Sequence, residues 1–150
     1  MSDDDIRGTI TQWHSTFAEI EDAGERLREE ANLVLWHGRL ATVRHDSTAV
    51  AHLVEAYAHL RNRLKPYEEK MLAQGWQAAI PPLGIMDARF DAMRGDLATM
   101  RGATFAASEW YRSAWQRLAP VFEDWDRDRE MLSGEHMKKL RQRLLPYIAP

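Results

Sequence analysis

The side chains of this sequence best suited to binding chemistry form a row of arginines with one aromatic residue among them. Arg94, Arg101 and Arg112 are separated by seven and eleven residues, and Phe105 follows Arg94 by eleven. At about 100° per residue, these spacings place all four on nearly one line of a helix. Arginine binds phosphate oxygens through paired N–H donors, and an aromatic ring stacks on a base. The row therefore predicts a surface that contacts the backbone of RNA or DNA.

Basic side chains elsewhere in the sequence are candidates to extend this surface. They are Arg61, Lys65, Lys138, Lys139, Arg141 and Arg143. In the alternative interpretation, the row is an ordinary solvated helix face whose charge is balanced by Asp87, Asp91 and Asp96. The chain carries 20 basic and 23 acidic residues, a net charge of −3, whereas free-standing nucleic-acid-binding proteins are usually basic. A subunit held in place by protein partners needs less positive charge, so both interpretations stay open.

The residue spacing supports a metal site or a catalytic site less well than a nucleic-acid-binding surface. His45, His52 and His59 are seven residues apart, but no histidine follows a glutamate by three positions, as the motif of di-iron bundles requires. We expect an exposed or hydrogen-bonded histidine row. The sequence also lacks a nucleophile elbow, a phosphate-binding loop and paired catalytic carboxylates. We predict a protein that is not an enzyme and has no metal or cofactor.

A calcium loop is a further alternative near the C-terminus. Residues 124–135 place acids at the first, third, fifth and twelfth positions of an EF-hand loop. Arg129, however, stands where that loop needs glycine, and no second loop is present to pair with it. Helix-surface ion pairs between Glu123 and Arg127, and between Asp126 and Arg129, are the preferred interpretation.

Two series of mostly hydrophobic residues at helical spacing, here called ladders, predict the helices that must position these residues. The first contains Ile6, Ile10, Trp13, Phe17, Ile20, Gly24, Leu27, Ala31, Val34, Gly38 and Ala41. The second contains Met86, Phe90, Met93, Leu97, Met100, Thr104, Ala107, Tyr111, Ala114, Leu118, Val121 and Trp125. Alternating steps of four and three keep side chains on one stripe of a helix. We therefore predict one helix from Ser2 to about Arg44, and another that runs on from about Asp87, with a kink at Pro120.

The remaining elements complete an all-α expectation. A further helix should begin at a Ser47 or Thr48 cap and end at Gly75, with a kink or break at Pro66. Residues 76–85 form an irregular apolar connection, and a short helix follows Ser133-Gly134 and ends near Leu145. We predict one domain, residues 1–150, folded as an antiparallel bundle of three long helices plus a short C-terminal helix.

Several apolar or small residues are candidates for contacts with other subunits. Residues 33–43 are apolar on nearly all sides, which predicts burial at the bundle centre or beneath a neighbouring subunit. Gly95 and Gly102 lie off the hydrophobic ladder and predict close approach by another backbone or by a ligand, or else a crossing by a neighbouring helix of the same chain. The interface candidates are Leu33, Leu35, Trp36, Leu40, Val43, Trp76, Ile80, Gly95 and Gly102.

Composition and the N-terminal residues bear on the cellular location of the protein. The acidic start Met-Ser-Asp-Asp-Asp is unlike the basic region of a signal peptide. No apolar run approaches about 18 residues, the length at which a membrane span is suspected, and the chain contains no cysteine. We expect a cytoplasmic protein that does not enter the membrane.

In size, helix layout and arginine rows, the chain resembles the small helical subunit of CRISPR effector complexes. That resemblance implies a non-enzymatic structural subunit in antiviral defence, with other protein subunits and guide RNA or target nucleic acid as partners. A protein-only adaptor or homo-oligomeric bundle is the alternative. Trp36-His37-Gly38 is also similar to the tripeptide of the small secreted Trp-x-Gly family, a more distant alternative, although that family places it in a turn between two helices.

Overall fold

The computed structural model describes residues 4, 6–11, 22–127 and 134–148, and this part of the chain is helical with short connections. The elements are α2 (Ala23–Val43), α3 (Ser47–Ala73), α4 (Gly84–Met100), α5 (Thr104–Arg127), α6 (Glu135–Leu144) and the 3₁₀ turn η1 (Leu145–Tyr147). Residues 6–11 are helical as well. The all-α prediction is confirmed. None of the described helices is long and apolar enough to cross a membrane.

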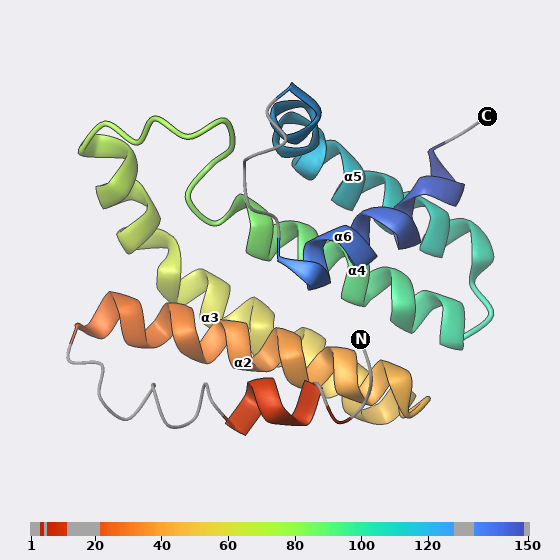
Figure 1. The fold of residues 1–150 in the computed structure, drawn as a ribbon. Helices are drawn as coiled ribbons and strands as arrows, with labels where there is room; N and C mark the ends of the chain where they lie inside the picture. The colour runs from red at the N-terminus through yellow and green to blue at the C-terminus, as the bar shows by residue number, and fades with distance from the viewer. Residues whose placement is uncertain (1–3, 5, 12–21, 128–133, 149–150) are drawn as a thin grey trace.

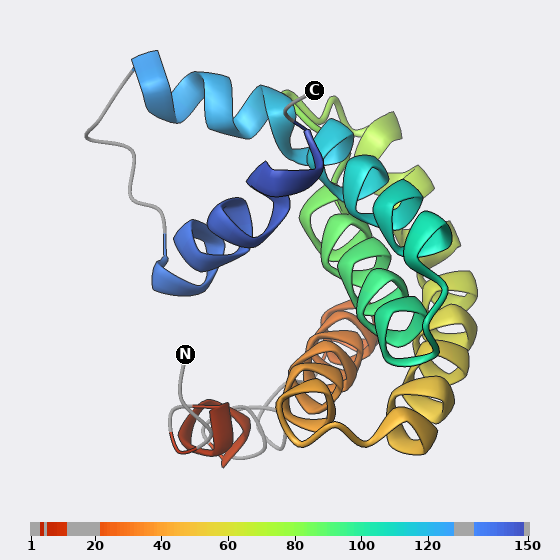
Figure 2. The same ribbon diagram turned by 90° about the vertical axis from the view of Figure 1, so that its right-hand side faces the viewer.

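The helices form two hairpins that pack on one another. α2 and α3 run antiparallel through one tight turn, and α4 and α5 do the same (Figure 1). α4 is the central element because it packs against α2, α3 and α5. α6 crosses near the α4–α5 hairpin, as the turned view shows (Figure 2). Side chains on α4 are therefore placed to contact three neighbouring helices.

The predicted long helix after Asp87 is wrong, since the chain turns back at Gly102. Gly102 has φ +74°, and the amides of Gly102 and Ala103 donate to the carbonyls of Thr99 and Ala98. This pair of bonds is the Schellman ending of a helix, in which glycine takes the left-handed conformation. The hydrophobic ladder resumes in phase after the turn, so its periodicity concealed the break.

The predicted first helix is also divided. α2 begins at Ala23, because the extended Asp22 caps it by accepting a hydrogen bond from the Glu25 amide (2.9 Å). Ile6 and Ile10 are buried, as the ladder requires, but they pack against Leu33 and Trp36 of α2. Residues 6–11 therefore lie beside α2 rather than extending it, so the prediction of three long helices is wrong.

The observed ends of the other helices agree more closely with those predicted from the sequence. Asp46, not Ser47 or Thr48, caps α3 by accepting from the Ala49 amide (3.1 Å). Gly75 follows the end of α3 with φ +88°, as expected of a helix stop. Pro66 lies inside α3 and Pro120 inside α5, so neither proline ends its helix.

Candidate functional site

Three aspartates on α4 organise the polar interior of the molecule. Asp91 is 1% exposed and Asp96 is 7% exposed, and Asp87 is half-buried. Asp91 accepts hydrogen bonds from Ser113 (2.6 Å) and Arg117 (2.8 Å) of α5 and from Arg94 (3.0 Å). These carboxylates are thus interior ligands of arginine. The alternative in which they balance a solvated face is wrong.

Asp87 and Asp96 make similar contacts to other helices. Asp87 accepts from the Tyr57 hydroxyl (3.1 Å) and from Arg61 Nε (2.9 Å), both on α3. Burial and the nearby Asp87 raise the pKa of Tyr57. Asp96 accepts from the Tyr111 hydroxyl of α5 (2.7 Å) and from Arg143 of α6. Through these two aspartates, α4 is hydrogen-bonded to α3, α5 and α6.

A solvent-open depression, here called the α3–α5 hollow, lies where α3, α4 and α5 meet. Its volume is about 310 Å³. Its lining is Arg61, Asn62, Lys65, Glu68, Asp87, Phe90, Arg94 and Arg117. Arg61 and Lys65, predicted to extend the basic row, line the same hollow as Arg94, from which they are 33 and 29 residues distant in sequence. Arg117 is a fourth basic residue of the hollow, and it was not predicted from the sequence.

The basic groups of the hollow keep donors to spare. Arg61 binds Asp87 and Glu68 through Nε and one Nη, and Arg117 binds Asp91 through Nε. A guanidinium has five N–H donors, so each retains some for a ligand. Lys65 is exposed and forms no ion pair with any described residue. The carboxylates hold the arginines in place without using all of the guanidinium N–H donors.

Arg94 is held by two aromatic rings as well as by its hydrogen bond to Asp91. Its guanidinium carbon lies 4.0 Å from the ring centroids of both Phe90 and Trp110. Its Nε is buried and has no hydrogen-bond partner among the described residues. Burial lowers the pKa of Arg94, partly offset by Asp91. The side chain is positioned by packing as well as by charge.

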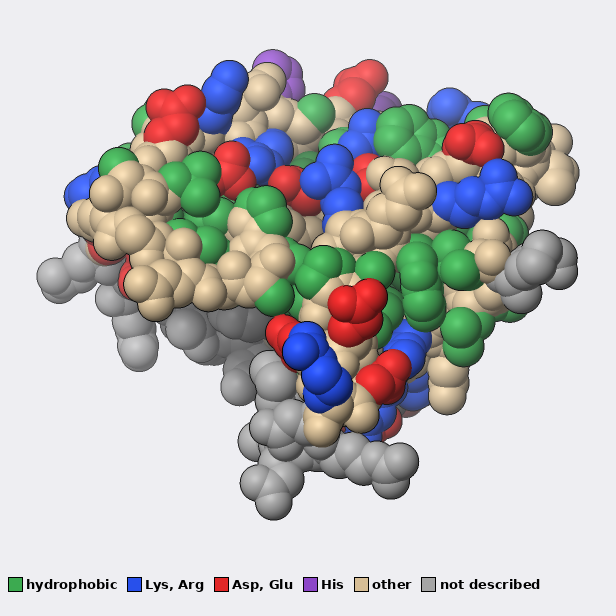
Figure 3. Space-filling view, turned by 90° about the horizontal axis from the view of Figure 1, so that it is seen from above, with side chains coloured by type: hydrophobic (Ala, Val, Ile, Leu, Met, Phe, Trp, Pro, Cys, Tyr) green, Lys and Arg blue, Asp and Glu red, His purple; other side chains and the backbone are tan. Residues whose placement is uncertain are grey.

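The rest of the predicted arginine row is not one line, because the Gly102 turn divides it. Arg101 is exposed at the end of α4, and Phe105 is 78% exposed on α5. Arg112 donates to the Tyr147 carbonyl (3.1 Å) and to Glu109 (3.1 Å). Figure 3 shows basic, acidic and hydrophobic side chains interspersed on one face of the molecule rather than one basic surface.

The C-terminal basic residues lie on α6, away from the hollow. Lys138 pairs with Glu135 (3.6 Å), and Arg141 binds Asp126 of α5 (2.8 Å). Lys139 and Arg143 line a separate cavity between α2, α4 and α6. They therefore do not extend the surface that contains Arg94.

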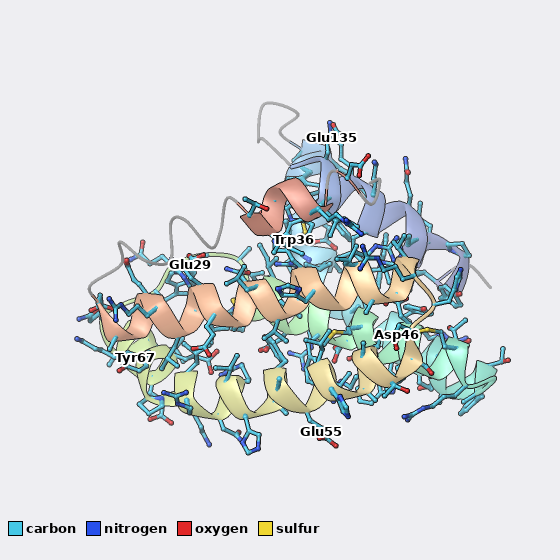
Figure 4. The ribbon with its side chains drawn as sticks, turned by 90° about the horizontal axis from the view of Figure 1, so that it is seen from below. Glu29, Trp36, Asp46, Glu55, Tyr67 and Glu135 are labelled. Carbon is cyan, nitrogen blue, oxygen red and sulfur yellow. The ribbon has the colours of Figure 1, made fainter. Side chains whose placement is uncertain are left out.

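The predicted interface residues divide into buried and exposed groups. Leu33, Leu35 and Trp36 are buried by the chain itself, and Leu40 is half-buried beside them. Figure 4 shows Trp36 on the side of α2 that faces residues 6–11 and α6. The bundle-centre alternative thus accounts for these residues, and a neighbouring subunit is not needed. Val43 is 36% exposed.

The remaining interface candidates, two in the α3–α4 connection and two glycines, differ in their exposure and in their close contacts. Trp76 is 43% exposed, and its indole N–H donates to the Ile80 carbonyl (2.7 Å), whereas Ile80 is buried. At Gly95 an added Cβ would lie 2.6 Å from the Tyr111 ring, so the close neighbour is α5 of the same chain. At Gly102 it would meet no described atom within 4 Å, so close approach there is wrong.

The other motifs have plain structural roles where they are described. His45, His52 and His59 are exposed. Arg127 pairs with Asp124 rather than Glu123, and part of the calcium-like segment, including Arg129, lies outside the described residues. Trp36-His37-Gly38 lies within α2, not in a turn. No group of three or more potential metal ligands occurs in the described part of the chain.

Comparison of the chain with protein-family models, curated proteins and solved structures found no match.

Proposed function

We propose that this protein is a non-enzymatic structural subunit of a multi-subunit assembly, and that its α3–α5 hollow contacts the phosphate backbone of RNA or DNA. The observation that supports the proposal is the convergence of Arg61, Lys65, Arg94 and Arg117 from three helices. Glu68 and Asp87 line the same hollow and Asp91 lies beneath it. Among the described residues, four basic groups against three carboxylates leave the hollow positive.

Rigid arginines suit backbone contacts better than base reading. The aspartates and the aromatic rings hold Arg61 and Arg94 in fixed positions, so little side-chain entropy is lost when a phosphate binds. Contacts to phosphate carry no sequence information of their own. The hollow should therefore bind single-stranded nucleic acid with weak sequence preference, and binding should weaken as salt is raised.

The role envisaged is that of the small helical subunit of CRISPR effector complexes, which the chain resembles in size and helical character. In this role, neighbouring protein subunits hold the chain against guide RNA or target nucleic acid, so a net charge of −3 is tolerable. Phe105, exposed on α5, is a candidate stacking residue, although it does not line the hollow.

A protein-only adaptor is the second candidate, and one observation favours it. Leu72, Trp76 and Ile85 are 52%, 43% and 39% exposed, and they flank or lie within the connection between α3 and α4. Exposed apolar side chains mark protein contact sites where they form one contiguous patch, and the adaptor role assumes that these three do. In this role, the arginine–aspartate network would serve only to stabilise the fold.

A matched pair of charge reversals on α3 tests the proposed function. Lys65 lines the hollow, whereas Lys70 lies outside it, and both are exposed. Lys65→Glu should weaken binding of a single-stranded oligonucleotide by about tenfold, which corresponds to about 1.4 kcal/mol, and Lys70→Glu should have little effect. Fluorescence anisotropy on the purified protein, or on its complex if one copurifies, measures both. Equal loss in the two variants, or none in either, favours the adaptor.

A further inference from the structure

A second basic cavity lies between α2, α4 and α6, distinct from the α3–α5 hollow. Its volume is about 90 Å³, room for several water molecules, since one water needs about 10–15 Å³ measured in this way. Its lining includes the apolar side chains of Trp36, Met93 and Leu140. It also includes the charged groups of Arg39, Arg89, Asp96, Lys139 and Arg143, together with the imidazole of His136.

The charges around this cavity are unbalanced. Asp96 is the one carboxylate among the described residues of its lining, and that carboxylate already accepts from Tyr111 and Arg143. Arg39 is half-buried and forms no ion pair within the described part of the chain. Burial and the neighbouring Arg143 lower the pKa of Arg39. Lys139 likewise has no ion-pair partner among the described residues.

Arg89 is the most unusual of these groups. Its guanidinium lies 5.0 Å from the Trp36 ring centroid and donates to the Asn32 amide oxygen (3.1 Å). No carboxylate of the described residues lies within ion-pair distance, and Glu29 is connected to it only through Asn32. Burial lowers the pKa of Arg89 to about 10. The same positive group helps to lower the pKa of His136.

A buried guanidinium without a counter-ion is destabilising unless an anion is supplied. Among the described residues, Arg39, Arg89, Lys139 and Arg143 stand against one carboxylate, an excess that suits a dianion better than a monoanion. The apolar side chains in the lining suit a ring or a short hydrocarbon chain. We propose that this cavity binds a small organic phosphate monoester, with its phosphate between Arg39 and Arg89 and its apolar group against Trp36 and Met93.

Titration calorimetry with phenyl phosphate as the probe tests the proposal on the full chain. Phenol serves as the uncharged control and inorganic phosphate as the ion without an apolar group. Phenyl phosphate should bind most tightly, and it should also raise the melting temperature, because a ligand that binds only the native state stabilises it. An absence of binding by millimolar phenyl phosphate, or phenol that binds as well, would overturn the proposal.

Variants locate the binding site within the molecule. Arg39→Gln should weaken phenyl phosphate binding about tenfold and leave the fold intact, since Arg39 has no ion pair to lose among the described residues. Arg63→Gln, an exposed change on α3, is the matched control and should bind as the unaltered protein does. Lys65→Glu should also bind normally, which separates this cavity from the nucleic-acid hollow. Equal affinities for Arg39→Gln and Arg63→Gln would contradict the assignment.

Discussion

Asp91 is almost fully buried, yet its two carboxylate oxygens bind Arg94, Ser113 and Arg117. Removing one partner of such a cluster leaves the remaining charges unpaired. Asp91→Ala should therefore lower the free energy of unfolding by about 3 kcal/mol, at the small end of the range for buried pairs because both arginines are partly exposed. Urea unfolding followed by circular dichroism measures this loss.

The control removes an exposed ion pair in the same way. Glu109 and Arg112 are both more than half exposed in their side chains, so Glu109→Ala should cost less than about 1 kcal/mol. Similar losses for Asp91→Ala and Glu109→Ala would mean that the buried aspartates do not organise the interior.

Gly95 tests the closeness of α4 and α5. An added Cβ would lie within 3 Å of three Tyr111 ring atoms, and Tyr111 is itself fixed by its bond to Asp96 (2.7 Å). Gly95→Ala should lower stability by about 1–3 kcal/mol, as overpacking does. Gly8→Ala, where an added Cβ meets no described atom within 4 Å, should be neutral or stabilising. Comparison of the free energies of unfolding of Gly95→Ala and Gly8→Ala shows whether α4 and α5 pack this closely at Gly95.

His136 predicts a pH effect on stability. Burial, together with Arg89, lowers its pKa below the usual 6.5 in the native state. The native state thus favours the neutral ring, and this stabilisation is present above about pH 6.5 and is lost as pH falls through the native pKa. Arg39, Lys139, Arg143 and the carboxylate of Asp96 are the other charged groups that line the same cavity among the described residues.

The measurement is the melting temperature at about pH 7.5 and pH 5.5. His136→Asn should lose part of the decrease that the unaltered protein shows between these values. His52→Asn, which alters an exposed histidine of α3, should retain the whole decrease. Identical pH dependence in the two variants would show that His136 does not contribute.

At the scale of helices, sequence periodicity predicted which residues are buried better than it predicted where helices end. Phe90, Leu97, Tyr111 and Leu118 of the second ladder are all buried. The ladder did not reveal the turn, because its three- and four-residue steps continue in phase from α4 to α5. The local signals of helix ends were the Arg101-Gly102 pair and the Asp22 cap. Such signals outweigh a continuous hydrophobic stripe in deciding where a helix begins or ends.

Gly102→Ala distinguishes the observed turn from the predicted continuous helix. In a continuous helix, alanine would add about 0.5–1 kcal/mol of stability. At φ +74°, alanine instead costs about 1–2 kcal/mol, because its Cβ approaches the following carbonyl. Gly102→Asn should cost less, since asparagine tolerates this conformation. A rise in melting temperature for Gly102→Ala would contradict the turn.

At the scale of the whole molecule, the sequence predicted part of the candidate site. It grouped Arg94 with Arg61 and Lys65, and the structure places all three around one hollow. It did not predict that Asp87, Asp91 and Asp96 bind arginines from α3, α5 and α6. Those pairs depend on which helices are neighbours, and hydrophobic periodicity says which face is buried but not against which helix. Arg39 and Arg89, which have no ion-pair partner among the described residues, were not predicted for the same reason.

The salt dependence of single-strand binding tests the central claim most directly. A protein whose hollow neutralises phosphates releases condensed counterions, so the logarithm of its affinity should fall linearly with the logarithm of salt concentration. The slope should become shallower by about 0.7 for each phosphate that a variant no longer neutralises. Lys65→Glu should show a shallower slope than Lys70→Glu, with little difference between oligonucleotide sequences. A protein or purified complex that ignores RNA and DNA at low salt, or equal slopes in the two variants, would contradict a nucleic-acid role for the hollow.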